Sequence, residues 1–248
     1  MVIIYIISSA IIVSLISLIG IMTLPVKEGD LKKITTLFVG LSAGTLLGDS
    51  FLHLMPEAVE KSNGSFYVWL WLLGGIIIFF ILEKIIFWRH CHTADCEGHS
   101  HRLGLMNLVG DGLHNFIDGV IIAVSFLVSA PVGIATTLAI IIHEIPQEIG
   151  DFGVLIHLGY TKSKALYLNS LSAILAVLGA VVGIIAGARV DNFINFAMPL
   201  AAGGFIYIAT ADILPELHKE TEIAKSLKQL ISILAGMGIM LVLKVYFK

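Results

Sequence analysis

The sequence predicts an all-α integral membrane protein with eight transmembrane helices and short loops. Of its 248 residues, 57% are hydrophobic and 13% are charged, whereas a soluble domain carries roughly a quarter charged residues. Apolar stretches of about twenty residues, the length that crosses a bilayer, recur along the whole chain. We therefore expect one transmembrane domain over residues 1–248, embedded in the lipid bilayer. A net charge of -3 gives no indication of a nucleic-acid partner.

The first apolar stretch reads as a retained helix, because it has neither a basic start nor an A-x-A cleavage site. The connections between the stretches are short and polar, except for one longer segment before the fourth. The expected helices cover residues 2–24, 34–57, 66–88, 104–129, 132–158, 166–188, 193–215 and 228–247.

Basic residues predict the orientation of these helices. If the N-terminus lies outside, the outer ends and loops hold only four of the 15 Lys and Arg residues: Lys61, Arg189, Lys244 and Lys248. The others lie on the inner side, as the positive-inside rule requires. We expect a multi-pass protein of the cell membrane with both termini outside.

A short pattern occurs at the ends of two helices. The second expected helix ends in HLMPEA, with Pro56 and Glu57, and the seventh ends in DILPEL, with Pro215 and Glu216. These two helices run in opposite directions in the assigned orientation. The pattern predicts an inverted repeat that relates helices 1–3 to helices 6–8 around central helices 4 and 5.

Glycines spaced by four residues lie on the sixth expected helix, at Gly179, Gly183 and Gly187. Such a stripe is typical of a face for close helix packing. Whether this face also forms a homodimer seam is left open by the sequence.

The fourth and fifth expected helices each carry a dense cluster of polar groups. Ionisable groups inside a membrane cost about 3 kcal/mol each, so they must be paired or ligated. Imidazole, carboxylate and amide oxygens on facing helices are what a divalent cation needs. Helical spacing predicts one face of Asp111, His114, Asn115 and Asp118, a second stripe of His143, Gln147 and Asp151, and an adjacent one of Glu144 and Glu148.

Pro146 lies inside the fifth helix. It frees the carbonyl of Ile142 from its usual hydrogen bond and should kink the segment. In a membrane such a break is tolerated where it faces protein or a wet cavity, which favours a substrate site.

Four outlying residues have two interpretations each. Asp49 and His53 on the second helix, and Asp212 on the seventh, could line the metal pathway or support its ligands. His157 lies near the cytoplasmic end of the fifth helix, where it serves as an interfacial residue or an exit-side ligand.

The loop over residues 90–103 is rich in soft donors and lies in the cytoplasm in this orientation, where thiols stay reduced. Nitrogen and sulfur donors at these spacings suit zinc. The loop could pass metal on, sense cytosolic metal, or act only as a polar linker. Its donors are His90, Cys91, His92, Cys96, His99 and His101.

The paired motifs HNFIDG and HEIPQEIGDF resemble the ZIP (Zrt/Irt-like) family of divalent-metal transporters. DGLHNF and the glycine-aspartate tail of the second motif resemble its LIV-1 branch. The resemblance implies passage of zinc, and also of iron, manganese or cadmium, into the cytoplasm through a metal site between helices 4 and 5. The metal is cargo, and no resident cofactor is implied. The ligands carried over are His114, Asn115, Asp118, His143, Glu144 and Gln147.

This chain departs from the family pattern at two positions. Members of the LIV-1 branch usually carry a second histidine where this chain has Gln147. Other members carry a glutamate on helix 6 where this chain has Ala176. A fully occupied two-metal centre and tight zinc binding are therefore not implied.

Two other function classes are alternatives to a transporter. HEIPQE contains His-Glu, but an intramembrane zinc hydrolase of the HExxH type needs a second histidine at position 147, where glutamine stands. A membrane metal sensor would bind the ion without flux. The sequence contains no nucleotide-binding motif, which argues against an ATP-driven pump.

Overall fold

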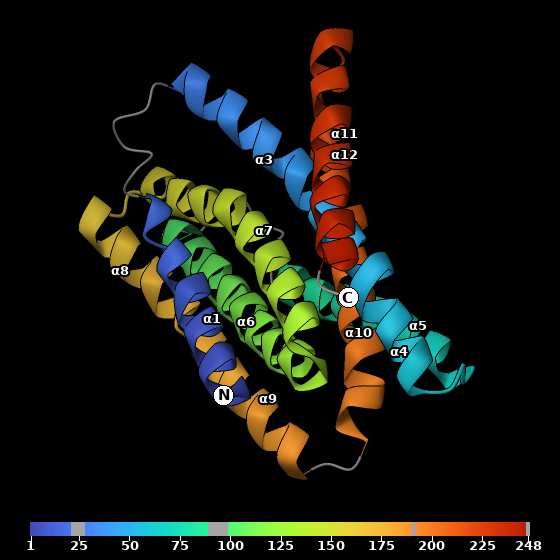
Figure 1. Cartoon of the computed structure of the whole chain (residues 1–248). Coiled ribbons are helices and arrows are strands. Elements are labelled where there is room, and N and C mark those ends of the chain that lie inside the picture. The colour runs from blue at the N-terminus through green and yellow to red at the C-terminus, as the bar shows by residue number, and fades with distance from the viewer. Residues whose placement is uncertain (21–27, 89–98, 190–191, 247–248) are drawn as a thin grey trace.

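The computed structural model describes residues 1–20, 28–88, 99–189 and 192–246, and every element within them is a helix (Figure 1). The two η elements are short π-helical turns within longer helices. The elements are α1 (Val2–Ile16), α3 (Glu28–Asp49), η1 (Ser50–Leu54), α4 (Met55–Lys61), α5 (Tyr67–Trp88), α6 (His99–Val128), α7 (Ala130–His157), α8 (Lys162–Ala173), α9 (Leu175–Arg189), α10 (Phe193–Tyr207), η2 (Ile208–Ile213), α11 (Leu214–His218) and α12 (Ile223–Tyr246).

In the described part of the chain these elements form eight helical segments in chain order, some of them made of two or three consecutive elements. We call these segments rods. They confirm the predicted all-α class. The second rod is α3–η1–α4, the sixth is α8–α9, and the seventh is α10–η2–α11. Six helices are long and apolar enough to cross a membrane. Within the described residues α1 is a shorter apolar helix, and α7, which carries three acidic residues, is not among the six. The chain is a multi-pass membrane protein.

Several helices begin earlier than predicted. Helix α3 begins at Glu28 instead of residue 34, and α6 begins at His99 instead of residue 104. Polar first turns continue the backbone hydrogen bonding beyond the apolar window, because a helix can extend past the hydrocarbon core. The predicted 90–103 loop is therefore shorter: 90–98 lie outside the described residues, and His99 and His101 lie on α6. Residues 21–24 of the first predicted helix also lie outside them.

The two π-helical turns occupy equivalent places in their rods. Pro56 follows η1 by two residues, and Pro215 follows η2 by two residues. Proline has no N–H for the carbonyl four residues earlier, which lies inside the π turn in both rods. A π turn redirects such carbonyls within an otherwise continuous helix.

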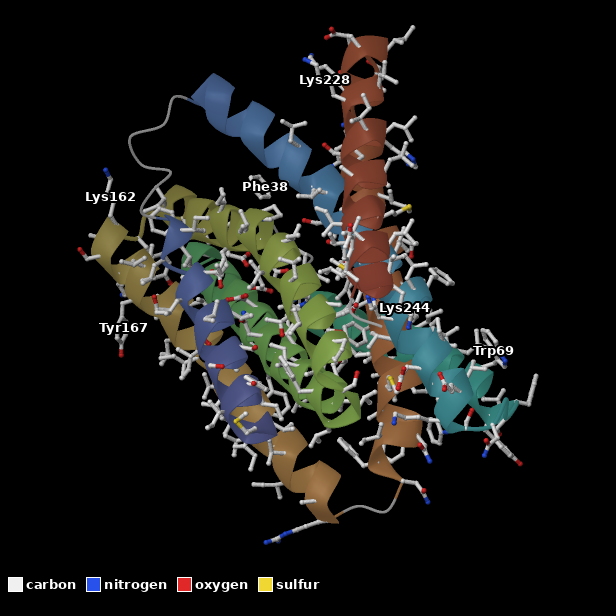
Figure 2. The ribbon with its side chains drawn as sticks, viewed as in Figure 1. Phe38, Trp69, Lys162, Tyr167, Lys228 and Lys244 are labelled. Carbon is white, nitrogen blue, oxygen red and sulfur yellow. The ribbon has the colours of Figure 1, made fainter. Side chains whose placement is uncertain are left out.

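Helices α6 and α7 pack against each other and lie at the centre of the fold (Figure 1). Helices α1, α8 and α9 pack along one side of this pair, and α3 and α10 contact it from the other. Helix α12 packs against α3, and α5 packs against α10. Large apolar side chains such as Trp69 and Tyr167 point outward from the bundle (Figure 2), as expected for a lipid-facing surface.

The predicted glycine stripe on the sixth rod is used inside the chain. A Cβ added at Gly179 would overlap the backbone of Phe116, so glycine is required where α9 crosses α6. Gly183 packs in the same way on Ala123 and Val120 of α6. The stripe is therefore a close-packing face between α9 and α6, and it needs no second copy of the chain to explain it.

Candidate metal centre

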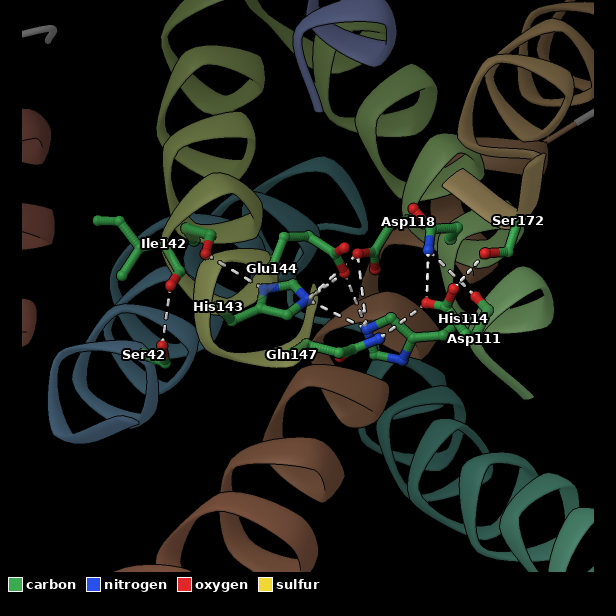
Figure 3. A network of polar contacts seen from close by, with 11 residues as sticks. Ser42, Asp111, His114, Asp118, Ile142, His143, Glu144, Gln147 and Ser172 are labelled. Atoms are coloured by element: carbon green, nitrogen blue, oxygen red, sulfur yellow. Dashed lines mark hydrogen bonds and ion pairs between the residues drawn. The ribbon is translucent and has the colours of Figure 1, made fainter. Parts of the chain in front are cut away.

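Four potential ligands converge between the two central helices (Figure 3). His114 and Asp118 come from α6, and His143 and Glu144 come from α7. One ligating atom from each lies within 4.8 Å of the others. The His114 and His143 Nε2 atoms are 3.1 Å apart. The His143 Nε2 atom lies 3.2 Å from Asp118 Oδ2 and 3.5 Å from Glu144 Oε1.

This cluster is enclosed on all but one side. Asp118, His143 and Glu144 are buried, whereas the His114 side chain keeps 18% of its accessible surface. The ring of Phe205 from α10 packs edge-on against the His143 imidazole, with ring centroids 6.1 Å apart. The enclosure excludes water from three of the four groups, so their mutual electrostatic interactions are strong.

The atoms at the centre of the cluster are mainly acceptors. His143 Nδ1 lies 3.2 Å from the Ala139 carbonyl oxygen, an arrangement in which Nδ1–H donates and Nε2 keeps its lone pair. In the described part of the chain, Asp118 Oδ2 and both Glu144 carboxylate oxygens receive no hydrogen bond although they are buried. Lone pairs that face one another in this way favour a bound cation. Two imidazole nitrogens and two carboxylates suit zinc and similar divalent ions.

The amides of Asn115 and Gln147 bind a different partner. The Asn115 Nδ2 atom donates to Asp111 Oδ1 at 2.9 Å, and Gln147 Nε2 lies 3.4 Å from the same oxygen. The Ser172 hydroxyl of α8 donates to the other Asp111 oxygen (Figure 3). Both amide nitrogens are therefore directed at Asp111, one helical turn from His114. The Asn115 Oδ1 atom is buried and receives no hydrogen bond from the described residues.

A second carboxylate is held by α8 in the same way. Glu148 is fully buried and accepts a hydrogen bond from the Asn169 amide. Sequence reasoning missed Asn169 and Ser172 as partners of the acidic residues. The available signal was their spacing of three residues on one predicted helix, which places both on one helix face.

Pro146 produces the predicted free carbonyl. The Ser42 hydroxyl of α3 lies 2.9 Å from the Ile142 carbonyl oxygen and 2.7 Å from that of Phe38, within its own helix (Figure 3). Helix α7 continues through Pro146 as one element and bends along its length (Figure 1). The α3 hydroxyl thus supplies the hydrogen-bond partner that proline removes, one residue before His143.

The outlying candidates lie in different surroundings. Asp49 and His53 are buried and lie 3.4 Å apart, and Asp49 Oδ2 accepts a hydrogen bond from Thr136 of α7 at 2.8 Å. Asp212 is exposed, and Asp151 is half-buried. Residues 90, 91, 92 and 96 lie outside the described part of the chain, and the structure describes the backbone of His99, His101 and His157 but not their side chains.

Comparison with known proteins places these features in a sequence family. The family model described as "ZIP Zinc transporter" matches residues 1–102 and 88–244. The chain is 35% identical over 222 residues to Zinc transporter ZIP13 of Pongo abelii, covering 84% of this chain and 66% of that relative. It is 30% identical over 308 residues to Zinc transporter zipt-7.2 of Caenorhabditis elegans, covering 98% of this chain and 66% of that relative. It is 32% identical over 282 residues to the Zinc transporter ZIP13 homolog of Drosophila melanogaster, covering 88% of this chain and 79% of that relative. The chain thus spans 66% of the length of the first two relatives.

Proposed function

We propose, from the premise that this chain belongs to the ZIP zinc transporter family, that it carries divalent transition-metal ions across a membrane into the cytoplasm. Zinc is the main substrate, and iron, manganese and cadmium compete for the same route. The ion passes through the cluster of His114, Asp118, His143 and Glu144 between α6 and α7. The relatives' names supply zinc, and the donor set of this chain fits it.

The observation that carries this proposal is the set of unpartnered acceptors at the centre of a membrane-spanning bundle. An unpaired buried polar group costs about 1–3 kcal/mol, and a charged one costs more. Three buried carboxylate oxygens that receive no hydrogen bond from the described residues are stabilised when a cation occupies the space between them and the two imidazoles. Conduction requires binding that is favourable yet weak enough for release, and the partial exposure of His114 leaves the ion one open side.

The family is one of transporters, and the chain is not an enzyme. The chain also lacks the second zinc-binding histidine that an HExxH-type hydrolase needs. Position 147 is glutamine, and its amide nitrogen points to Asp111. A sensor that binds without flux is the remaining rival. It predicts the same metal occupancy as the transporter, so only a flux measurement separates the two.

The chain falls in the LIV-1 branch, on the strength of DGLHNF and HEIPQEIGD. Asn115 and Gln147 complete the ligand set of this chain by rotating their amide oxygens toward the ion when it arrives. The buried, donor-free oxygen of Asn115 supports this role. Asp111 and Glu148 hold the surrounding amides and supply negative charge close to the ion.

The eight rods cross the membrane as one domain with both termini outside, in the cell membrane. The two π turns, each two residues before a proline in rods two and seven, support the inverted repeat around α6 and α7. Lys162 and Lys228 lie toward the same end of the bundle, the end at which α3 begins (Figure 2). That end is cytoplasmic under the positive-inside rule.

The segment over residues 90–103 binds cytosolic metal through its cysteines and histidines. Their soft donors support zinc affinity. Binding there follows passage through the bundle and is not required for flux.

The direct test is uptake of radioactive zinc by proteoliposomes that contain the purified chain, with iron, manganese and cadmium as competitors. Saturable uptake that the competitors reduce is expected. Stoichiometric zinc binding without uptake would establish the sensor instead. Empty liposomes and liposomes with the Glu144→Gln variant are the matched controls.

A further inference from the structure

A polar cavity of ≈ 380 Å³ lies at one end of the bundle, away from the residues of the candidate metal centre. Its walls come from the turn between α4 and α5 and from the start of α10, which packs beside both helices. The residues that matter for its chemistry are Lys61, Asn63, Tyr67, Trp71, Asn192 and Asn195.

The ends of the candidate spans predict that the cavity lies at the depth of the lipid headgroups. Four candidate spans terminate around it: one ends at Lys61, one begins at Tyr67, one ends at Arg189 and one begins at Phe193. The ends of spanning helices mark the boundary of the hydrocarbon core. Tyr67 and Trp71 line the cavity from α5, and such aromatic residues gather at the same interface.

The cavity presents hydrogen-bond donors and one positive charge. The ammonium group of Lys61 supplies the charge, and among the described residues that line the cavity none is a carboxylate. Glu57 lies 3.8 Å from Lys61, but both side chains are partly exposed and such pairs contribute little. The Lys61 ammonium has two further N–H groups for another acceptor.

Two asparagines reach the cavity from strained positions. Asn63 has φ 52° and Asn192 has φ 59°, both in the left-handed region that glycine adopts most easily. Asn192 Oδ1 accepts a hydrogen bond from Asn195 at 3.3 Å, which leaves the Asn192 amide nitrogen as a donor. Asparagine at both left-handed positions adds an amide to the cavity that glycine could not provide.

From this combination we propose that the cavity binds the phosphate of a phospholipid headgroup. Lys61 neutralises the phosphate, the asparagine amides donate to its oxygens, and the rings of Tyr67 and Trp71 contact the rest of the headgroup. Among the described residues that line the cavity, Lys61 alone is charged, and its positive charge disfavours a metal ion. A lipid is favoured over free phosphate because four span ends and two interfacial aromatics surround the cavity.

The test is lipid retention measured by native mass spectrometry on the delipidated whole chain in detergent. Phosphatidylglycerol and phosphatidylcholine are titrated separately, and inorganic phosphate is added in excess in a competing arm. The wild-type chain should bind phosphatidylglycerol more tightly than phosphatidylcholine. Lys61→Gln should weaken phosphatidylglycerol binding about fivefold, because one lysine at an anionic surface contributes about 1 kcal/mol.

The control is Lys162→Gln, an exposed lysine at the start of α8, at the opposite end of the span that ends at Arg189. It should leave lipid affinity unchanged. The double variant Asn63→Gly and Asn192→Gly removes both amides while keeping left-handed backbone, and it should also weaken binding. Equal retention of the two lipids, or an unchanged affinity in Lys61→Gln, overturns the proposal. Displacement of the lipid by the excess of inorganic phosphate overturns its assignment to a lipid.

Discussion

The Nε2 atoms of His114 and His143 lie 3.1 Å apart although the two residues stand on different helices. The Nδ1 contact of His143 with the Ala139 carbonyl directs the His143 lone pair at His114. Asp118 and Glu144 close the same space with oxygens that receive no hydrogen bond from the described residues. Removing one member of this group should therefore affect the ion more than the fold.

We expect His114→Ala and Glu144→Gln each to reduce zinc flux to near background. The first removes a neutral nitrogen donor, and the second removes a charge that offsets the 2+ ion in a low dielectric. Initial rates of radioactive zinc uptake at matched abundance measure the effect. Glu222→Gln, at an exposed glutamate outside the cluster, is the control and should transport normally. Wild-type flux in either cluster variant would remove this site from the pathway.

Gln147→His should lower the apparent zinc KM and raise the preference for zinc over manganese. An imidazole nitrogen is a better zinc donor than an amide oxygen, and a tenfold gain in affinity corresponds to about 1.4 kcal/mol. The maximal rate should fall if release becomes limiting. Zinc and manganese uptake curves for both proteins make the comparison. Superimposable zinc curves would mean that residue 147 serves Asp111 alone, as its hydrogen bond in the structure indicates.

Ser42→Ala should destabilise the protein by about 1–3 kcal/mol, because it leaves the buried Ile142 carbonyl without the donor that Pro146 cannot provide. Zinc affinity should also fall, since His143 is the next residue. Thermal unfolding in detergent and zinc titration measure the two effects. Ser226→Ala, which removes an exposed hydroxyl bonded to the Glu222 carbonyl just before α12, is the matched control. Equal stability of the two variants would show that the α3 hydroxyl does not support the bend.

Gly75→Ala should destabilise the fold by about 1–3 kcal/mol, whereas Gly74→Ala should be neutral or slightly stabilising. A Cβ at Gly75 would overlap the backbone of Leu200 where α5 crosses α10, while a Cβ at Gly74 meets nothing within 4 Å. Overpacking at a close crossing is destabilising, and alanine in open space favours a helix. Unfolding of the two variants side by side provides the measurement, and a reversed order would contradict the packing of α5 on α10.

Replacing the cysteines at 91 and 96 by serine, and His90, His92, His99 and His101 by glutamine, should preserve flux and weaken cytosolic metal binding. Polar replacements of similar size keep the start of α6 helical while removing the soft donors. Zinc stoichiometry and proteoliposome uptake are measured on the same preparation. Loss of uptake in folded protein would make the segment part of the conduction route.

Periodicity and hydropathy were enough to predict the helical architecture and the donor types on α6 and α7. An apolar stretch of about twenty residues has few alternatives to a spanning helix. Residues spaced by four lie on one face wherever the helix is placed, so His114 and Asp118 had to point the same way. Pro146 likewise frees the Ile142 carbonyl by local chemistry alone. Helix ends were predicted less well, because polar turns such as the start of α6 continue past the apolar window.

The sequence by itself determined which residues are able to bind a metal, and the tertiary structure decided which of them meet. Whether Gln147 faces His143 or Asp111, and whether α8 brings Ser172 and Asn169 to the acidic residues, depends on the rotation and crossing of whole helices. Rotation and crossing are set by close approach at small residues, such as Gly179 of α9 against the α6 backbone, and local sequence spacing does not encode this long-range packing. The same packing placed Asp49 beside Thr136 of α7, a partner 87 residues away.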